Sequence, residues 1–358
     1  MPTRMWPTAF QNVVHTLKAL RRGVDTALCG AVAGAYDGAL EVWSAECSGA
    51  APSARATLRR RVHIPAAHAG SVSTLGVPRD VYSLRHLGDN LFVSGGTDGK
   101  LCIWHVQGDD VQLRQTVDLG GRYPLDAALV CIPGPSDSAE PSVLLAVALT
   151  DKRIHLYVRE SSSQDFTHRL ALQGHEDWVR ALDFAVVCAD PSHFEVALAS
   201  GAQDNTVRLW KVGVESGSAG TSSGGTRDTF EAMAADLMRE EDGIATKKHY
   251  VELAHIRCAV SLDALLLGHD DAVMDVRWCP PLAPQAESPL PPAPAMLLSC
   301  ALDNSVIVWA PHAEAHHVLG EPDLAQALWL PAHRLGDVGS QSGGFYDAVW
   351  APAVPGRP

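Results

Sequence analysis

The sequence has a shortage of positive charge, no closely spaced cysteines and no long apolar run. Its 28 Lys and Arg residues stand against 41 Asp and Glu residues, a net charge of −13, which argues against unaided nucleic-acid binding because phosphate affinity comes chiefly from cationic side chains. None of the eight cysteines forms a C-x-x-C pair, so we expect buried thiols in a reducing compartment and no zinc or disulfide framework. The N-terminus lacks a signal-peptide core, and no stretch approaches the ~18 apolar residues of a membrane helix, so we expect no membrane partner.

A spacing of six residues between an aspartate and an aromatic residue recurs along the chain. Each aspartate stands in a polar turn flanked by short runs of small, β-branched or apolar residues, as a β-hairpin requires. The five pairs are Asp37 with Trp43, Asp98 with Trp104, Asp151 with Tyr157, Asp204 with Trp210, and Asp303 with Trp309. Five pairs in register predict an all-β WD40 propeller over residues 1–358, with blades ending near residues 43, 104, 157, 210 and 309.

Three of the five repeats add a histidine and a serine to the aspartate and the tryptophan. His175 lies 35 residues before Trp210, and Ser200 lies four before Asp204. The aspartate can accept a hydrogen bond from the histidine, whose ring the serine and the tryptophan can hold, and such a buried network fixes one geometry only if every member is satisfied. The predicted structural networks are His175, Ser200, Asp204 and Trp210; His269, Ser299, Asp303 and Trp309; and His68, Ser94, Asp98 and Trp104.

The other two repeats lack these residues. In the repeat that ends at Tyr157, Val147 replaces the serine and Gly120-Gly121 stands where a Gly-His pair falls. The first repeat has Ala33 at the serine position and no suitably spaced histidine. We therefore expect apolar packing to be the main force that holds these two blades.

Long insertions separate the repeats. The largest, residues 213–261, begins with a Gly- and Ser-rich run, and its residues 228–240 have one apolar face at helical spacing, so we predict an inserted loop with a short helix. This helix either packs on the propeller or docks a partner subunit. Residues 344–350 predict the first strand of a further, partial blade over 345–358. An array cut there leaves strand edges unpaired, so we expect the chain to be part of a longer protein.

Several motifs that suggest chemistry are weak. Residues 95–100 are similar to a phosphate-binding loop, but Leu101 follows where magnesium binding requires Ser or Thr. Residues 220–224 match a nucleophile elbow in letters only, because no strand precedes them. His312, His316 and His317 with Glu314 lack a closed metal-ligand spacing. The three arginines at 59–61 favour a solvated edge over an RNA contact. We therefore expect no catalytic, cofactor-binding or metal-binding residues.

Individual strings of the repeats resemble one family of WD-repeat proteins. Gly-His-Glu-Asp-Trp at residues 174–178, Leu-Leu-Leu-Gly-His at 265–269, Trp-Ala-Pro at 309–311 and Gly-Phe-Tyr-Asp at 344–347 stand in the order found in the Elongator complex protein 2 family. The matching strings extend from about residue 91 to residue 350. The resemblance is to the first of the two seven-bladed propellers of that family, and it implies an incomplete copy of it here.

The resemblance implies a non-catalytic scaffold subunit without a cofactor. Such subunits hold together the large scaffold subunit of Elongator and its catalytic radical-SAM and acetyltransferase subunit. The complex modifies the wobble uridine of tRNA in the cytoplasm, and histone acetylation and transcription elongation in the nucleus are also ascribed to it. Contact with tRNA is then indirect, through the complex. An unrelated WD-repeat adaptor for another multiprotein complex is the alternative.

A rim for protein binding follows from the hairpin geometry. In each blade the Gly-His loop and the aspartate turn lie on the same face, because two strands run out and back between them. Glu176, Trp178 and Gln203 are therefore candidates for one protein-binding rim, with Trp178 as its anchor. The alternative for Trp178 is packing against the neighbouring blade.

Overall fold

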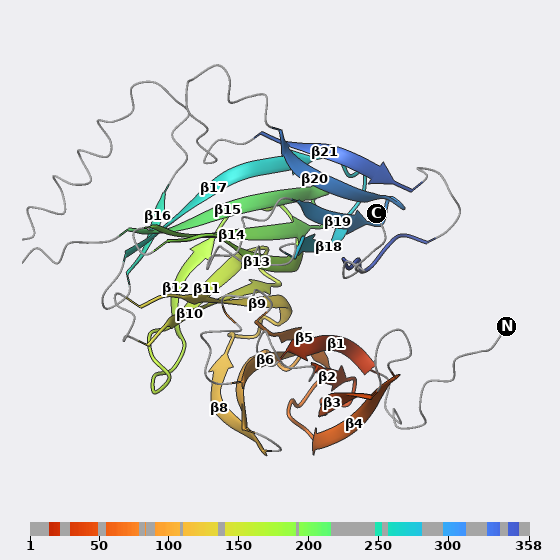
Figure 1. The fold of residues 1–358 in the computed structure, drawn as a ribbon, viewed down its shortest axis with the longest axis vertical. Coiled ribbons are helices and arrows are strands. Elements are labelled where there is room, and N and C mark those ends of the chain that lie inside the picture. Colours follow the sequence, from red (N-terminus) through yellow and green to blue (C-terminus); the bar gives the residue numbers. More distant parts are fainter. Residues whose placement is uncertain are drawn as a thin grey trace, which may run out of the picture.

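Five antiparallel sheets make up the described part of the computed structural model, shown in Figure 1. The structure describes residues 14–21, 29–48, 55–78, 83, 90–107, 110–134, 140–190, 193–215, 248–252, 257–280, 296–312, 328–336 and 343–350. None of the named elements within these residues is a helix. No described helix is long and apolar enough to cross a lipid bilayer.

Each sheet is built from strands that are close in sequence. The first contains β1 (Val14–Arg21), β2 (Cys29–Ala35), β3 (Leu40–Ser48) and β4 (Arg55–Ile64), and the second β5 (Val72–Gly76), β6 (Asn90–Gly96), β7 (Lys100–Gln107) and β8 (Asp110–Asp118). The third contains β9 (Pro124–Ile132), β10 (Ser142–Leu149), β11 (Ile154–Arg159) and β12 (Thr167–Leu172). The fourth has the order β13 (Val179–Asp190), β14 (His193–Ala202), β15 (Thr206–Glu215), β17 (Arg257–Leu267) and β16 (His249–Glu252). The fifth contains β18 (Val273–Trp278), β19 (Leu297–Ala301), β20 (Val306–His312) and β21 (Leu328–Leu335).

Burial decreases from the middle of a sheet to its last strand. Every residue of β10 and β11 is buried, and β10 consists almost entirely of aliphatic residues. A strand that is covered on both faces carries such a continuous apolar run. By contrast, β8 and β21 are mostly exposed and carry charged or polar residues between apolar ones. The middle strands therefore form the core, and the last strand of each sheet forms the outer surface.

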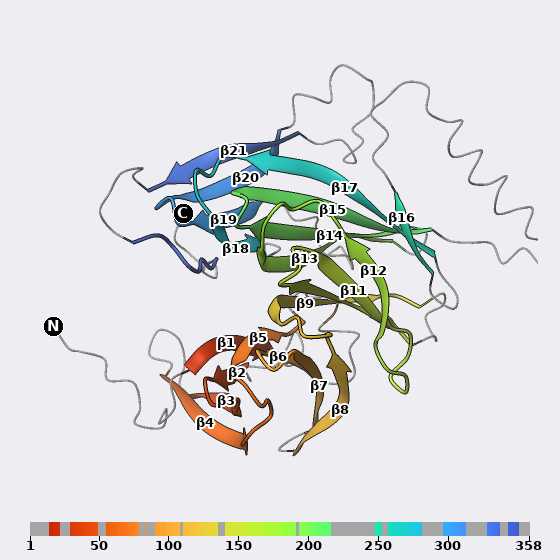
Figure 2. The ribbon, with the colours of Figure 1, turned by 180° about the vertical axis from the view of Figure 1, so that it is seen from behind.

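The sheets pack face to face in chain order. Apolar clusters join the first sheet to the second, the second to the third, the third to the fourth, and the fourth to the fifth. Figures 1 and 2 show this succession from the first two sheets at one end of the molecule to β21 at the other. Serial packing of four-stranded sheets is the architecture of a β-propeller, so the predicted fold class is confirmed.

The turn between the second and third strands is the same in all five sheets. Its aspartate accepts a hydrogen bond from the backbone N–H two residues later, at 2.9–3.2 Å. The residue between them has a left-handed backbone, with φ of 80° at Gly38, 75° at Gly99, 67° at Lys152, 65° at Asn205 and 61° at Asn304. Glycine and asparagine tolerate this region better than other residues. The polar turn sequence thus has a direct backbone cause.

The predicted blade ends differ from the observed sheets. The aromatic residue of each repeat lies on the third strand, and an outer strand follows it, so the sheets end at Ile64, Asp118, Leu172, Leu267 and Leu335. The reason is that the aspartate–aromatic spacing marks the hairpin of the second and third strands and carries no information about the fourth.

Part of the insertion that was predicted as a loop over residues 213–261 is β-strand. Strand β15 continues to Glu215, and β16 together with the first half of β17 lies inside the predicted loop. These segments are strands because β17 pairs with β15 along ten registered positions, from Thr206 opposite Leu267 to Glu215 opposite Arg257. The predicted helix over 228–240 lies outside the described residues.

Residues 343–350 have no assigned strand, although a first strand was predicted at 344–350. They nevertheless lie along the fifth sheet. The N–H of Phe345 donates to the carbonyl of Ala301 at 3.0 Å, and the indole N–H of Trp350 donates to the carbonyl of Arg277 at 3.0 Å. This segment covers the inner part of the fifth sheet, on β18 and β19. Residues 351–358 lie outside the described part of the chain.

Candidate interaction rim

The fourth sheet contains a closed polar network of four side chains. His175 bonds through Nδ1 to Asp204 Oδ2 at 2.8 Å and through Nε2 to Ser200 Oγ at 2.8 Å. The indole N–H of Trp210 donates to the same serine oxygen at 3.0 Å. The tryptophan therefore holds the serine and does not reach the histidine ring. Ser200 on β14 contacts both His175 of the Gly-His loop and Trp210 of β15. The network therefore joins this loop to the two strands.

The second and fifth sheets repeat this arrangement. His68 is 3.1 Å from Asp98 and 2.7 Å from Ser94, and Trp104 donates to Ser94 at 2.8 Å. In the fifth sheet, the corresponding distances are 3.1 Å from His269 to Asp303, 2.7 Å from His269 to Ser299, and 2.8 Å from Trp309 to Ser299. All twelve predicted network residues thus come together in three sets of four.

The protonation states follow from burial and hydrogen bonding. Burial lowers the pKa of His68 and of His269, although Asp98 and Asp303 act in the opposite direction. Burial alone would raise the pKa of Asp204, but hydrogen bonds from His175, the Glu176 N–H and Thr206 outweigh it and hold the pKa well below its usual range. A neutral histidine can donate Nδ1–H to the carboxylate and accept the serine O–H at Nε2, so every polar atom of the network has a partner.

The third sheet has a different network at the same place. Asp151 Oδ2 accepts hydrogen bonds from Arg122 Nη1 at 2.8 Å and from His155 Nε2 at 3.0 Å. His155 Nδ1 lies 3.1 Å from His168 Nε2. Burial opposes the shift, but Arg122 and His155 hold the pKa of Asp151 below its ordinary value. Apolar packing is therefore joined here by a charged network.

The role of Arg122 was not predicted from the sequence, although its spacing to Tyr157 indicates it. It lies 35 residues before Tyr157, the spacing that separates His175 from Trp210. The arginine thus occupies the histidine position of its repeat. Val147, which replaces the network serine, is fully buried and packs in the apolar cluster between the second and third sheets. In the first sheet, Ala33 is likewise buried at the serine position.

The three predicted rim residues lie on the loop and the turn of the fourth sheet. Glu176 is exposed, and Trp178 and Gln203 are half-buried. The Gln203 N–H donates to the Trp178 carbonyl at 2.9 Å, which joins the turn to the loop. From the third sheet, Lys152 Nζ donates to the Glu176 carbonyl at 2.7 Å. The loop is thereby held from two sides, and the Trp178 side chain keeps part of its surface in solvent.

Buried carboxylates connect successive sheets through their innermost strands. Asp126 on β9 accepts the Leu182 N–H of β13 at 2.9 Å, and Asp183 on β13 accepts the Trp278 N–H of β18 at 2.8 Å. Asp275 on β18 accepts the Ala348 N–H at 3.3 Å. None of these aspartates was among the candidate residues predicted from the sequence. Each is an acid within a strand that is otherwise largely apolar, where a buried carboxylate requires donors.

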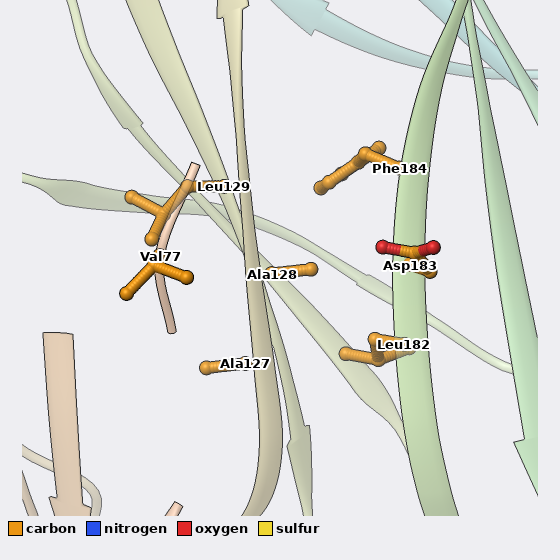
Figure 3. A pocket seen from close by; sticks show the side chains of 7 residues that line it. All are labelled: Val77, Ala127, Ala128, Leu129, Leu182, Asp183 and Phe184. Carbon is orange, nitrogen blue, oxygen red and sulfur yellow. The ribbon is translucent and has the colours of Figure 1, made fainter. Parts of the chain in front are cut away.

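A narrow pocket lies between β9 and β13, as Figure 3 shows. Its lining is apolar except for Asp183, whose carboxylate already accepts the backbone N–H of Trp278. Ligand and catalytic sites usually bring several polar groups together in a larger cavity. Among the described residues, no group of three or more His, Cys, Asp and Glu side chains could hold a metal ion. The group of His312, Glu314, His316 and His317, which the sequence did not favour as a metal site, extends into residues 313–327, outside that part.

Two of the repeats match a known family of protein repeats. A family model described as "WD domain, G-beta repeat" matches residues 62–105 and 166–211, which include two of the three networks. The chain therefore contains WD repeats. It is 29% identical over 265 residues to Elongator complex protein 2 of Danio rerio, a region that is 73% of this chain and 27% of that protein. It is 30% identical over 257 residues to the proteins of the same name from Mus musculus and Homo sapiens, 72% of this chain and 26% of each.

This WD-repeat protein therefore resembles Elongator complex protein 2 along most of its own length. The reverse coverage is much lower, because the chain spans about a quarter of the length of the curated relatives it matches. The similarity covers 257 residues, many more than the two stretches that the family model matches.

Proposed function

We propose that this chain is a scaffold subunit of an Elongator complex and that it displays the rim of Glu176, Trp178 and Gln203 to a neighbouring subunit. The observation that carries the proposal is the half-buried Trp178 on a loop held by Lys152 and by the turn at Gln203. A partly exposed aromatic residue on a rigid support is a common binding anchor, because little side-chain entropy is lost when it is covered. Similarity to Elongator complex protein 2 supports the choice of complex.

Rigid display is the mechanism. The Asp204 carboxylate accepts the Glu176 N–H at 2.9 Å as well as the His175 ring at 2.8 Å, so the network that holds the sheet also fixes the first residue of the rim. The loop is thus positioned before a partner arrives. Preorganisation of this kind increases affinity because less ordering is left for the binding step.

The role is structural and non-catalytic in this proposal. The subunit would hold the large scaffold subunit and the catalytic radical-SAM and acetyltransferase subunit together, and it would need no cofactor of its own. Its contribution to wobble-uridine modification of tRNA, and to any role in histone acetylation and transcription elongation, would pass through these partners. Its compartment would be the cytoplasm, with the nucleus as an additional one. The net charge of −13 agrees with an indirect contact to RNA.

The test is affinity purification of the Trp178→Ala variant from the source cell. We expect recovery of the Elongator large and catalytic subunits to fall at least ~10-fold, as for a binding anchor, while the melting temperature stays unchanged. The matched control is Leu113→Ala, which removes a half-exposed apolar side chain from β8, outside the rim. Equal recovery with both variants, or loss of the fold in Trp178→Ala, would refute the rim. Co-purification of a different complex would identify an unrelated adaptor instead.

A further inference from the structure

The outer strand of the first sheet is a basic strip in an acidic protein. Strand β4 carries arginines at positions 55, 59, 60 and 61 and His63, and it has no acidic residue. The whole chain has a net charge of −13. Among the other outer strands, β8 mixes signs with Asp110, Arg114 and Asp118, β17 carries one arginine and one aspartate, and β12 and β21 carry a single arginine each. Because like charges on one strand repel each other, a strip of this kind gains most from an acidic partner.

Arg59 and Arg60 of the strip have exposed side chains. Arg59 is exposed, and its side chain makes no hydrogen bond or ion pair with any residue that the structure describes. The Arg60 side chain is 49% exposed while it pairs with Glu41 at 3.0 Å. Arg61, the extra residue of a β-bulge opposite Val42 and Trp43, donates from Nε to Ser44 Oγ at 2.8 Å and is also exposed. Guanidinium groups in this position match carboxylates in a bidentate geometry.

The backbone of β4 offers a second kind of contact. Within the described residues, β4 pairs with β3 alone and ends the first sheet. An edge strand presents a row of N–H and C=O groups that another extended chain can pair with. Arginines along such an edge oppose pairing with a second copy of the same strand, since the two rows of positive charge would lie side by side. The same arginines favour an acidic strand.

The fourth sheet shows how such an edge is extended. Its outer strand β17 pairs on its free side with the four-residue strand β16. Glu252 of β16 stands opposite Arg257 of β17 in the register. The guanidinium of Arg257 also lies over the ring of Tyr250, 3.7 Å from its centroid. A short extended segment with an acid and an aromatic residue thus adds to an outer strand beside an arginine.

We propose that β4 is a docking edge for an extended acidic segment of a partner protein, which adds to the first sheet as a fifth strand. Backbone hydrogen bonds to β4 supply the pairing, and carboxylates of the segment bind Arg59 and Arg60. This is the strand-addition mode of peptide recognition, in which backbone pairing supplies affinity and side chains supply selectivity. The fourth sheet accommodates its own fifth strand in the same way.

A synthetic peptide tests the proposal. The probe is a fluorescein-labelled peptide of about ten residues, the length of β4 at ~3.3 Å per residue, in which Glu alternates with Val and one Val is Tyr. Its binding to the full chain is measured by fluorescence anisotropy. Charge reversal by Arg59→Glu should weaken binding about 10-fold, because a charge-assisted pair is replaced by repulsion. The control is Arg153→Glu, which makes the same charge change at an exposed arginine in the third sheet. It should leave the affinity within about twofold, as expected for a site far from the peptide.

Two further arms separate strand addition from simple charge attraction. A peptide of the same sequence with alternate backbone nitrogens methylated keeps its charge but loses its N–H donors, so it should not bind. Hydrogen exchange should show protection of the β4 amides by the unmethylated peptide only. Equal binding of the methylated peptide, or displacement by a single-stranded RNA of equal charge at the same concentration, would overturn the proposal and make the strip a general polyanion site. Equal weakening by Arg59→Glu and Arg153→Glu would also overturn it.

Discussion

The third and fourth sheets hold the same aspartate turn with different side chains. In the fourth sheet Asp204 binds a buried histidine that a serine and a tryptophan support, and the Asp204 side chain is 8% exposed. In the third sheet Asp151 binds Arg122 and His155, and its side chain is 22% exposed. In the third sheet, the exposed Arg122 stands at the histidine position, and the buried Val147 stands at the serine position. The turn geometry therefore survives the loss of the network that usually accompanies it.

We expect the two networks to stabilise their sheets by different amounts. A hydrogen bond to a buried charge stabilises more than one at the surface, because water competes less and an orphaned partner costs more. The side chain of Arg122 is 44% exposed, whereas that of His175 is 1% exposed. We expect the fourth sheet to be the more sensitive to substitution.

Removal of the two aspartates should have the largest effect. Asp204→Ala orphans the buried His175 ring and leaves the Glu176 and Thr206 N–H groups without this acceptor, so the free energy of unfolding should fall by about 3–5 kcal/mol. Asp151→Ala releases Arg122 into solvent and removes one partner of His155, which keeps its contact with His168, so it should cost about 1–2 kcal/mol. Urea denaturation followed by circular dichroism measures both. Equal losses would show that burial does not distinguish the two networks.

Exchange of the serine and valine positions should have an intermediate effect. Ser200→Val leaves His175 Nε2 and the Trp210 indole N–H without their shared partner, a loss of about 2–3 kcal/mol. The reverse change, Val147→Ser, buries a hydroxyl among apolar side chains of the second and third sheets and should cost about 1–2 kcal/mol. The same urea experiment tests this pair. Stabilisation by Val147→Ser would mean that the third sheet can still form the missing network.

Acidification should produce the smallest and most selective effect. Burial lowers the pKa of His269 in the folded protein, so the unfolded chain binds its proton more readily. The stability contributed by the neutral ring is therefore complete above pH ~6.5, the ordinary histidine pKa, and is lost as the pH falls below it. The melting temperature should drop between pH 7.5 and pH 5.5.

Histidine variants assign this pH dependence. His269→Gln should reduce the drop in melting temperature, because one group that takes up a proton on unfolding has been removed. His63→Gln is the control, since the His63 side chain is 40% exposed and lies outside the three networks. A drop of unchanged size in His269→Gln would assign the pH dependence to other groups. His168 of the third sheet is the next group to substitute in that case, because burial, together with His155 and Arg122, lowers its pKa.

Much of the fold and part of the candidate site were predictable from local sequence. The aspartate–aromatic spacing identified all five hairpins because a tight turn and two short strands are encoded within a few residues. The members of the three networks were predictable for the same reason, as each recurs at a nearly constant distance along the chain. The role of Arg122 was not predicted, because a change of residue type at the histidine position removed the motif while the spacing remained.

Other features depend on residues far apart in the sequence. The outer strands were missed because they have no fixed distance from the aromatic residue, and β17 reaches β15 only after the long insertion. Asp126, Asp183 and Asp275 carry no local motif, since their donors are distant in the chain, 56 residues away for Leu182, 95 for Trp278 and 73 for Ala348. Such contacts appear only when the sheets are packed together.

By itself the sequence determined the hairpins, the turn chemistry and the sets of histidine, serine, aspartate and tryptophan that lock three sheets. Those features arise from interactions within one repeat, so their spacing records them. Only the tertiary structure decided which sheets pack together, that Arg122 takes over the histidine position in the third sheet, and that β4, with exposed Arg59 and Arg60, is the last strand of the first sheet among the described residues. Packing and exposure depend on neighbours that are distant in the chain, and local sequence carries no direct record of them.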